Sequence, residues 1–448
     1  MIKYCNKQFK DKLLDFFLRI STSNIREHLY CRSEDLQLDE EIGNSMIEYL
    51  QYIKCDGEEY SDDEIYSELA EGDETIFISD ETEIELNFPY EDYYSTFTTL
   101  GNLIYCYDRV KMAEFDECLN LTLDKSHIFR VGVKDSFMNY KDFPYIQNKI
   151  KYKGVDVDIE TMSECDTYSL IIYFKHLFTE YTPVILDDDL FLKITVDEED
   201  RLSKEDIEII FNAFIFELSA SHEIKLIINP RPYITDDDFI EEFKQDEYKL
   251  RPLLFGKGLD DVIYLFNNAE ESYDNDKAIL EYVKVIEYVS QTIINIDFTD
   301  EIRKKLNDNR ALKPDANYIK ELGETVVSNQ KKYSKDRDKI KATIKKCCDI
   351  YQLREYLPNY CTKMIKLDNT KTNNKKTQTI DEAFNELCDA VSDTRDELSH
   401  AKANYTRNGK ECPDNEKDKF VILLRNICVQ VIRWFAHQNE YDRIVNIK

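Results

Sequence analysis

The sequence has little glycine and proline and no long apolar run. Its 448 residues include 10 glycines and 9 prolines against 30 tyrosines and 24 phenylalanines, a balance typical of folded domains and not of a disordered chain. Residues 1–6 lack the apolar stretch of a signal peptide. No segment approaches the roughly 20 consecutive apolar residues that cross a bilayer. We therefore expect a soluble, cytoplasmic protein with no membrane segment and no membrane partner.

Metal-binding spacings are also missing from the sequence. The twelve cysteines are scattered from Cys5 to Cys428 without a Cys-x-x-Cys pair, and no histidine stands at a zinc spacing. The aspartate runs at 187–189 and 236–238 lack the glycine and glutamate spacing of a calcium loop, so they are interpreted as loop and cap residues. The sequence predicts free thiols in a reducing compartment, no metal and no cofactor.

Acidic charge is concentrated in the first half of the chain. Residues 1–250 contain 25 basic and 57 acidic side chains, whereas residues 251–448 contain 34 and 33. Because such an excess of carboxylates repels phosphate, the first half is not expected to bind nucleic acid. The densest acidic run, 56–85, is interpreted as a solvated face. An acidic docking surface for a basic protein is the alternative.

Short apolar runs predict strands in the acidic half. These runs lie at 82–86, 103–107, 128–133, 190–196 and 224–229. Each has the length and the β-branched or aromatic content of a strand. Before the last run, Ser203 with Asp206 three residues later predicts the start of a capped helix. Residues 1–250 are therefore predicted to form an α+β domain, and no catalytic motif is recognised in it.

The pattern changes near Arg251-Pro252, where helical periodicity replaces the short apolar runs. Helices are predicted from about 274 to 293 and at 299–308, 315–330, 336–356 and 379–400, followed by a closing helix through 420–434. Low glycine content and short connections favour an antiparallel bundle. The predicted fold class is an α+β amino-terminal domain followed by an all-α helical bundle at 257–448.

One charged residue interrupts an apolar stripe in the helix before the last. Thr379, with Glu382 three residues later, has the spacing of a capping box and predicts the helix start. The stripe consists of Ile380, Phe384, Leu387 and Val391. Its next position is Arg395, and such local inconsistencies are more often functional or strained than accidental. The alternative is an arginine at the core edge, with its stem on apolar surface and its head paired with a carboxylate.

Arg395 also begins a short motif. It is followed by the polar Asp396 and, five residues on, by His400. Five residues turn an ideal helix by roughly 140°, so one straight helix does not bring Arg395 and His400 together. Either the helix ends or bends near Ser399, or two chains supply one site. A loop-like run, 404–415, precedes the closing helix.

This motif and order of helices resemble HEPN-domain ribonucleases and are most similar to the Apea-like branch of bacterial anti-phage, abortive-infection proteins. The resemblance covers residues 257–440 and implies an HEPN-like bundle, a homodimer, and metal-independent cleavage of RNA by its 2′-hydroxyl at a site shared by two chains. It implies that Arg395 stabilises the charged phosphorane, that His400 serves as acid or base, and that Asp396 orients them. The residue types suit this chemistry, since histidine titrates near neutral pH and a guanidinium holds two phosphate oxygens.

Two basic stretches accompany the motif. The first is 331–346, and the second is 371–376, directly before the arginine–histidine helix. Lysine-rich surfaces are usually solvated, and contact with RNA phosphates is the alternative. The candidates for RNA binding are Lys371, Lys375, Lys376 and Lys402.

Two functional hypotheses follow. In the first, the protein is a metal-independent endoribonuclease effector of bacterial anti-phage defence, and its acidic domain senses a phage-derived trigger or restrains the nuclease. In the second, it is a non-catalytic interaction protein whose acidic domain binds a basic partner and whose bundle only dimerises. Incubation of the purified protein with RNA, with and without a chelator, distinguishes the two hypotheses.

Overall fold

The computed structural model describes most of the chain from residue 95 onward. The described segments are 95–134, 143–163, 165–178, 184, 189–197, 202–228, 249–367, 374–399 and 409–445, together with short pieces of the first 94 residues. Two compact units make up the structure, unit 1 being Met1–Ile207 with Leu226–Tyr248, and unit 2 being Glu208–Lys225 with Lys249–Lys448. Each unit is described by itself. Unit 2 includes part of one helix that precedes the predicted change of pattern at Arg251-Pro252.

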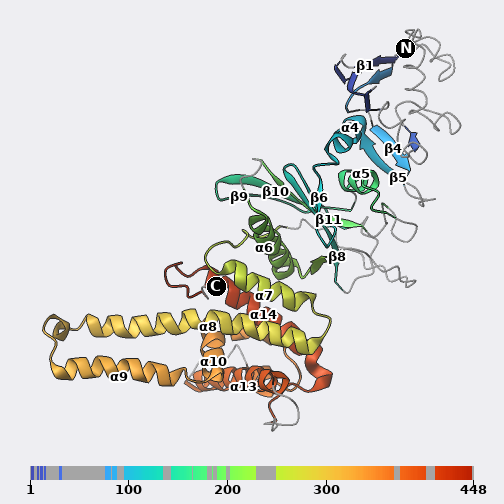
Figure 1. Ribbon diagram of the computed structural model, residues 1–448. Coiled ribbons are helices and arrows are strands. Elements are labelled where there is room, and N and C mark those ends of the chain that lie inside the picture. Colours follow the sequence, from blue (N-terminus) through green and yellow to red (C-terminus); the bar gives the residue numbers. More distant parts are fainter. Residues whose placement is uncertain are drawn as a thin grey trace. The chain divides into compact units, whose positions relative to one another are not determined.

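Unit 1 contains a seven-stranded antiparallel sheet (Figure 1). Its strands have the order β6-β7-β8-β11-β10-β9, and β12 also pairs with β8. Their bounds are β6 Glu114–Phe115, β7 Leu121–Leu123, β8 Ser126–Val133, β9 Gln147–Tyr152, β10 Val155–Met162, β11 Leu190–Val196 and β12 Leu226–Ile228. Along β10, Val155, Val157 and Ile159 are buried while the acidic residues between them are more exposed. This alternation is typical of a strand with one buried face.

Two smaller sheets precede the large one in sequence. β1 (Ile2–Tyr4) pairs with β3 (Ile76–Ile78) in parallel. The other sheet has the order β2-β4-β5 and is antiparallel, with bounds Tyr30–Arg32, Glu83–Asn87 and Ser95–Thr99. Strands β4, β8, β11 and β12 confirm four of the five predicted strand runs.

The fifth run, 103–107, is helical, so the predicted strand was wrong. Helix α4, Leu100–Arg109, begins after Thr99, whose side chain accepts a hydrogen bond from the Asn102 amide at 3.1 Å. The buried side chains of α4 are Leu100, Leu103, Ile104 and Cys106. They pack with those of α5, Asp166–Phe174, in the core of unit 1. A five-residue apolar run fits both a strand and a buried helix turn, and the Thr99 cap favours the helix.

The predicted capping box at Ser203 is confirmed. Ser203 Oγ accepts a hydrogen bond from the Asp206 amide at 3.2 Å, and Asp206 Oδ2 accepts one from the Ser203 amide at 3.2 Å. Helix α6, Lys204–His222, follows. Each bond satisfies a backbone N–H near the helix start that has no partner within the helix.

The carboxy-terminal half is helical, which confirms the predicted all-α region. Its longer helices are α7 Leu259–Glu271, α8 Asn275–Leu306, α9 Ala316–Lys332, α10 Asp336–Cys347, α13 Asn374–Ser399 and α14 Lys417–Ala436, and its short ones are α11 Ile350–Leu353 and α12 Thr362–Ile365. α8 packs against α7, α10 and α14, and α10 packs against α13. Across the described parts of both units, no helix is long and apolar enough to cross a membrane.

Several predicted helix bounds in unit 2 were wrong. α8 is one helix of 32 residues, so the separate helix predicted at 299–308 is its carboxy-terminal part. The region predicted as one helix at 336–356 is divided between α10 and α11, and α13 begins at Asn374, before the predicted start at Thr379. The predicted cap at Asp274 is present, since its side chain accepts hydrogen bonds from the amides of Asp276 and Lys277.

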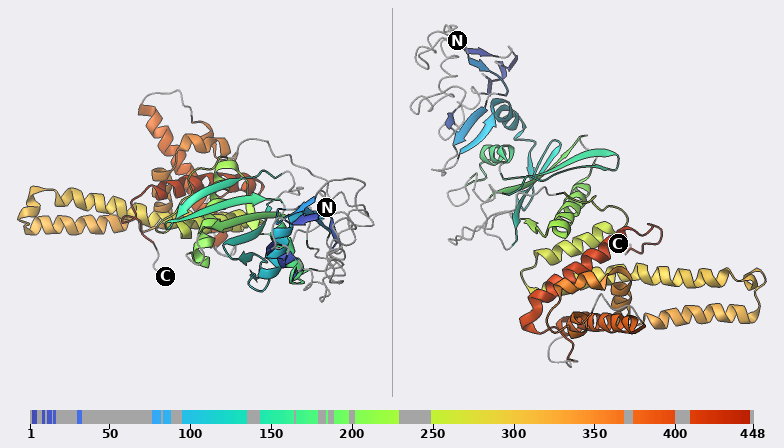
Figure 2. Two further views of the ribbon diagram at one scale, coloured as in Figure 1. Left: turned by 90° about the horizontal axis from the view of Figure 1, so that it is seen from above. Right: turned by 180° about the vertical axis from the view of Figure 1, so that it is seen from behind.

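The second half of α8 and helix α9 form an antiparallel hairpin that extends beyond the other helices of unit 2 (Figures 1 and 2). Its turn contains the short 3-10 helix η5, Asn309–Leu312. Arg310 of this turn pairs with Asp308 at 3.2 Å and with Glu321 of α9 at 2.9 Å. Tyr318 is buried and donates a hydrogen bond to the carbonyl oxygen of Lys305 at 2.9 Å. These contacts fix the turn and the first part of α9 against α8.

Buried charged pairs hold residues 208–222 of α6 to the other helices of unit 2. Arg433 of α14 pairs with Glu217, which is 0% exposed, at 3.1 Å. Arg425 of α14 pairs with Glu270 of α7 at 3.1 Å and donates hydrogen bonds to Ser219 of α6. Because both arginines serve as partners of buried groups, α14 positions α6 and α7 together.

Candidate functional site

Helix α13 places Arg395 at the edge of the helical core. Leu387 and Val391 of the predicted stripe are fully buried, and Ile380 and Phe384 are partly buried against the same core. The next position on this face is Arg395, whose side chain is 25% exposed. The stem therefore continues the apolar face, and the guanidinium group reaches the surface.

Three carboxylates surround the guanidinium group of Arg395. Nη2 lies 3.0 Å from Oε1 of Glu287 on α8 and 3.7 Å from Oδ2 of Asp336 on α10, and Nη1 lies 3.0 Å from Oδ1 of Asp396. The pairing that the core-edge interpretation predicts is thus present, with three partners instead of one. It links α8, α10 and α13 at one point of the bundle.

The environment shifts the pKa values of two of these carboxylates in opposite directions. Burial raises the pKa of Glu287 above its ordinary value, while the Arg395 charge opposes the rise and the Asp336 charge adds to it. The hydrogen bond from Lys339 lowers the pKa of Asp336, and Arg395 lowers it further. The carboxylate of Glu287 faces the guanidinium group directly, with Oε1 3.0 Å from Nη2 of Arg395.

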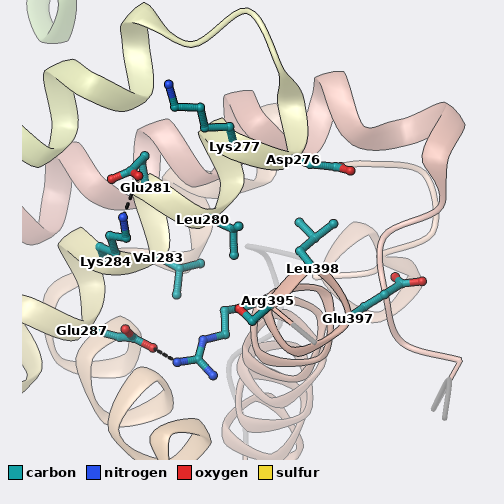
Figure 3. A pocket seen from close by; sticks show the side chains of 11 residues that line it. Asp276, Lys277, Leu280, Glu281, Val283, Lys284, Glu287, Arg395, Glu397 and Leu398 are labelled. Carbon is teal, nitrogen blue, oxygen red and sulfur yellow. Dashed lines mark hydrogen bonds and ion pairs between the residues drawn. The ribbon is translucent and has the colours of Figure 1, made fainter. Parts of the chain in front are cut away.

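Arg395 also lines a pocket of about 540 Å³ between the first half of α8 and the end of α13. From α8 the lining residues are Asp276, Lys277, Leu280, Glu281, Val283, Lys284 and Glu287, and from α13 they are Arg395, Glu397, Leu398 and Ser399. Figure 3 shows Arg395 reaching from α13 toward Glu287 on α8. The volume falls within the roughly 300–1,000 Å³ of small-molecule sites, and both apolar and charged side chains face it.

The pocket combines an apolar wall with charged groups. Leu280, Val283 and Leu398 supply apolar surface, and Lys284 is paired with Glu281 at 2.6 Å. Arg395 is the only arginine among the described lining residues, and its guanidinium group can hold two phosphate oxygens in a fork.

The other predicted site residues are only partly described. Asp396 is placed beside Arg395, whereas His400, Lys371 and Lys402 lie outside the described residues. Lys375 and Lys376 belong to the first turns of α13, but their side chains lie outside the described part. The described part of α13 ends at Ser399, a pocket residue that directly precedes His400 in the sequence.

Most of the basic stretch 331–346 is paired with carboxylates. Lys332 and Lys346 contact Asp297, Arg337 contacts Asp393, Lys339 contacts Asp336, and Lys345 contacts Asp381. No ion pair within the described segments holds Lys331, Lys335 or Lys341. The ion pairs favour the interpretation of this stretch as an ordinary charged surface of the end of α9 and of α10.

Sequence reasoning missed two partners of Arg395, namely Glu287 and Asp336. The only signal for Glu287 was its spacing of three from Lys284, beside the apolar stripe of α8. Asp336 stands in the first turn of α10, where acidic residues are favoured by the helix dipole, so its type alone carried no functional information. Within the described residues, no group of three or more histidine, cysteine or acidic side chains could hold a metal ion.

Comparisons of the chain with protein families, curated proteins and solved structures found no match. A functional assignment therefore depends on the residues of the chain itself. The feature that combines a sequence motif with a shaped site is the pocket at Arg395.

Proposed function

We propose that the protein is a metal-independent endoribonuclease whose site lies in the helical unit, as the resemblance to HEPN-domain ribonucleases implies. The observation that carries the proposal is the position of Arg395, which lines a pocket together with Ser399, the residue before His400. An arginine with its stem in the core and its head at a pocket is held well enough to position a phosphate.

In the proposed reaction the 2′-oxygen of a ribose attacks the adjacent phosphorus, and the 5′-oxygen of the next nucleotide leaves. One product carries a 2′,3′-cyclic phosphate and the other a 5′-hydroxyl group. His400 removes the proton of the 2′-hydroxyl or supplies one to the leaving oxygen. Arg395 stabilises the negative charge that develops on the non-bridging phosphate oxygens. Asp396, 3.0 Å from Nη1, orients the guanidinium group.

The proposed enzyme is a homodimer in which the segments from Arg395 to His400 of two chains face each other. Such an arrangement supplies two histidines to one site, so that one acts as base while the other acts as acid. The acidic amino-terminal half, with 57 acidic side chains in residues 1–250, senses a phage-derived trigger or restrains the nuclease. RNA is then expected to contact the helical unit, because the acidic half repels phosphate.

A second function is favoured by the ion pairs of Arg395. Three carboxylates already contact its guanidinium group and join α8, α10 and α13. This arrangement suits a non-catalytic interaction protein in which Arg395 stabilises the bundle, the bundle dimerises, and the acidic domain binds a basic partner. The two functions differ in whether His400 is needed for RNA cleavage.

The test is cleavage of total RNA by the full-length protein, with and without a chelator, in buffer and in extract of phage-infected cells. His400→Ala is expected to lower the cleavage rate by about 10²–10⁴-fold, the usual effect of losing a proton-transfer group. His437→Ala is the matched control, because His437 is exposed at the end of α14 and does not line the pocket. The cleaved RNA should carry 2′,3′-cyclic phosphate ends.

Three results would contradict the nuclease proposal. The first is full activity in His400→Ala, and the second is loss of wild-type activity in the presence of the chelator. The third is an inactive wild-type protein both in buffer and in infected-cell extract, which supports the interaction function instead.

A further inference from the structure

We propose that Glu287 and Asp336 form an acid clamp, which holds Arg395 away from phosphate until an activating event releases it. The proposal rests on the proposed function, since it concerns the regulation of the same arginine. Glu287 comes from α8 and Asp336 from the first turn of α10, so the clamp closes only when both helices are packed against α13.

The clamp occupies the part of the guanidinium group that a phosphate needs. Arginine binds phosphate best through two parallel N–H groups. In this structure Nη2 faces Glu287 and Asp336, while Nη1 faces Asp396. A phosphodiester arriving at this edge has to displace a carboxylate, and it brings a further negative charge to a place that holds three. With the clamp closed, the site is therefore expected to bind RNA weakly.

The two clamp residues differ in how readily they can leave Arg395. Asp336 also contacts Lys339, with Oδ1 2.9 Å from Nζ, and its Oδ2 is 3.7 Å from Arg395. It can therefore withdraw while its charge stays paired. Glu287 is closer to Arg395, at 3.0 Å, and its side chain is only 31% exposed. Glu287 therefore depends more on Arg395 and contributes most of the hold.

Asp396 is not part of the clamp in this proposal. It lies next to Arg395 on the same helix, its side chain is 43% exposed, and it contacts Nη1 only. When Glu287 and Asp336 withdraw, Asp396 still fixes one side of the guanidinium group, and Nη2 becomes available to a phosphate oxygen. Of the three carboxylates, Asp396 therefore orients the guanidinium group, while Glu287 and Asp336 restrain it.

The experiment measures binding of a short single-stranded RNA with 2′-O-methyl groups, which the proposed reaction cannot cleave, to the full-length protein. The variants are Glu287→Gln, Asp336→Asn and the double variant. A like charge within about 4–6 Å shifts the pKa of a charged group by one or more units, and one unit corresponds to a factor of about ten in an equilibrium constant. The double variant is therefore expected to bind the RNA about tenfold more tightly than the wild type. Cleavage of unmodified RNA is measured alongside.

Two controls separate the clamp from a general loss of negative charge. Asp300→Asn removes one carboxylate from the same helix α8, where Asp300 is 55% exposed and contacts Arg303. It should leave RNA binding within about twofold of the wild type, because an exposed charge that far from the pocket is screened. In an Arg395→Ala background, Glu287→Gln should no longer improve RNA binding, because the arginine that Glu287 restrains is absent.

The outcomes of the clamp test are distinct from those of the nuclease test. Tighter binding in the clamp variants but not in Asp300→Asn supports the clamp even when no cleavage occurs, in which case only the ribonuclease proposal fails. Unchanged or weaker binding in folded variants overturns the clamp, as does an equal gain in Asp300→Asn. If thermal melting shows that Glu287→Gln is unfolded, the Asp336→Asn variant alone tests the clamp. Its substitution is expected to leave the protein folded, because the Asp336 side chain is 53% exposed.

Discussion

Replacement of Arg395 is expected to affect the stability of the protein and the proposed RNA cleavage differently, so the two effects can be measured separately. In Arg395→Ala, Glu287 and Asp336 lose the cation that lies between them. An exposed ion pair contributes only about 0.2–1 kcal/mol, whereas removal of one partner of a fully buried pair costs about 3–5 kcal/mol. With Arg395 25% and Glu287 31% exposed, the site is intermediate. We expect the free energy of unfolding of unit 2 to fall by about 1–3 kcal/mol, the usual effect of an unsatisfied buried group.

Arg395→Lys keeps the positive charge and should lower the unfolding free energy by less than about 1 kcal/mol, since only the fork of N–H groups is lost. Denaturant unfolding at pH 7 compares both variants with the wild type. Adding Glu287→Gln to Arg395→Ala should recover part of the loss, because the unpaired charge is removed. An Arg395→Ala protein as stable as the wild type, or no recovery in the double variant, would refute this account. Cleavage should be absent in Arg395→Ala and strongly reduced in the folded Arg395→Lys protein.

Three further predictions concern pH, buried charge and assembly. Burial raises the folded-state pKa of Glu287 above its ordinary value of 4.5, so the folded state binds this proton more tightly than the unfolded state does. The stability difference between the wild type and Glu287→Gln, measured as unfolding free energy, should therefore decrease as pH rises from 4.5 through the folded pKa. A difference that does not change with pH would contradict the raised pKa. Arg433→Ala leaves Glu217, which is 0% exposed, without its cation and should destabilise unit 2 by about 3–5 kcal/mol. Arg433→Met with Glu217→Gln should restore most of this loss in the same denaturation assay. Light scattering at micromolar concentration should give the mass of a dimer, and a monomer would count against the shared site.

The main features of the fold could be predicted because they depend on local patterns. Period-two alternation and short apolar runs identify β8, β11 and β12, and helical spacing identifies the helices after Arg251. The reciprocal Ser203–Asp206 cap was predictable because both partners lie within one turn.

The errors occurred where packing decides between two locally acceptable structures. The run 103–107 was too short to show a period. α8 continues through Asp297, a residue of low helix propensity, whose carboxylate contacts Lys332 of α9 and Lys346 of α10. Such partners are distant in sequence and leave no local signal.

The local part of the candidate site was predictable, whereas the partners from distant helices were not. Arg395 was identified because it breaks an apolar stripe within its own helix, and Asp396 because it is adjacent. Glu287 and Asp336 come from helices far away in sequence, and the pocket needs α8 and α13 to be packed together. A stripe predicts which residue stands at the core edge, but only the tertiary arrangement determines which charges surround it.

The structural and catalytic interpretations of Arg395 share the same ion pairs. They differ in whether the carboxylates have to be exchangeable. An arginine that only joins helices is best served by partners that pair with no other cation, and within the described segments Arg395 is the only ion-pair partner of Glu287. A regulated phosphate site also needs a carboxylate that can move away from the arginine and still be paired with another cation. Asp336 has that property, because it contacts both Arg395 and Lys339. Substitution of Asp336 therefore separates the two interpretations most directly. If Asp336 only joins helices, its substitution lowers the unfolding free energy, whereas if it restrains Arg395, its substitution strengthens the binding of RNA.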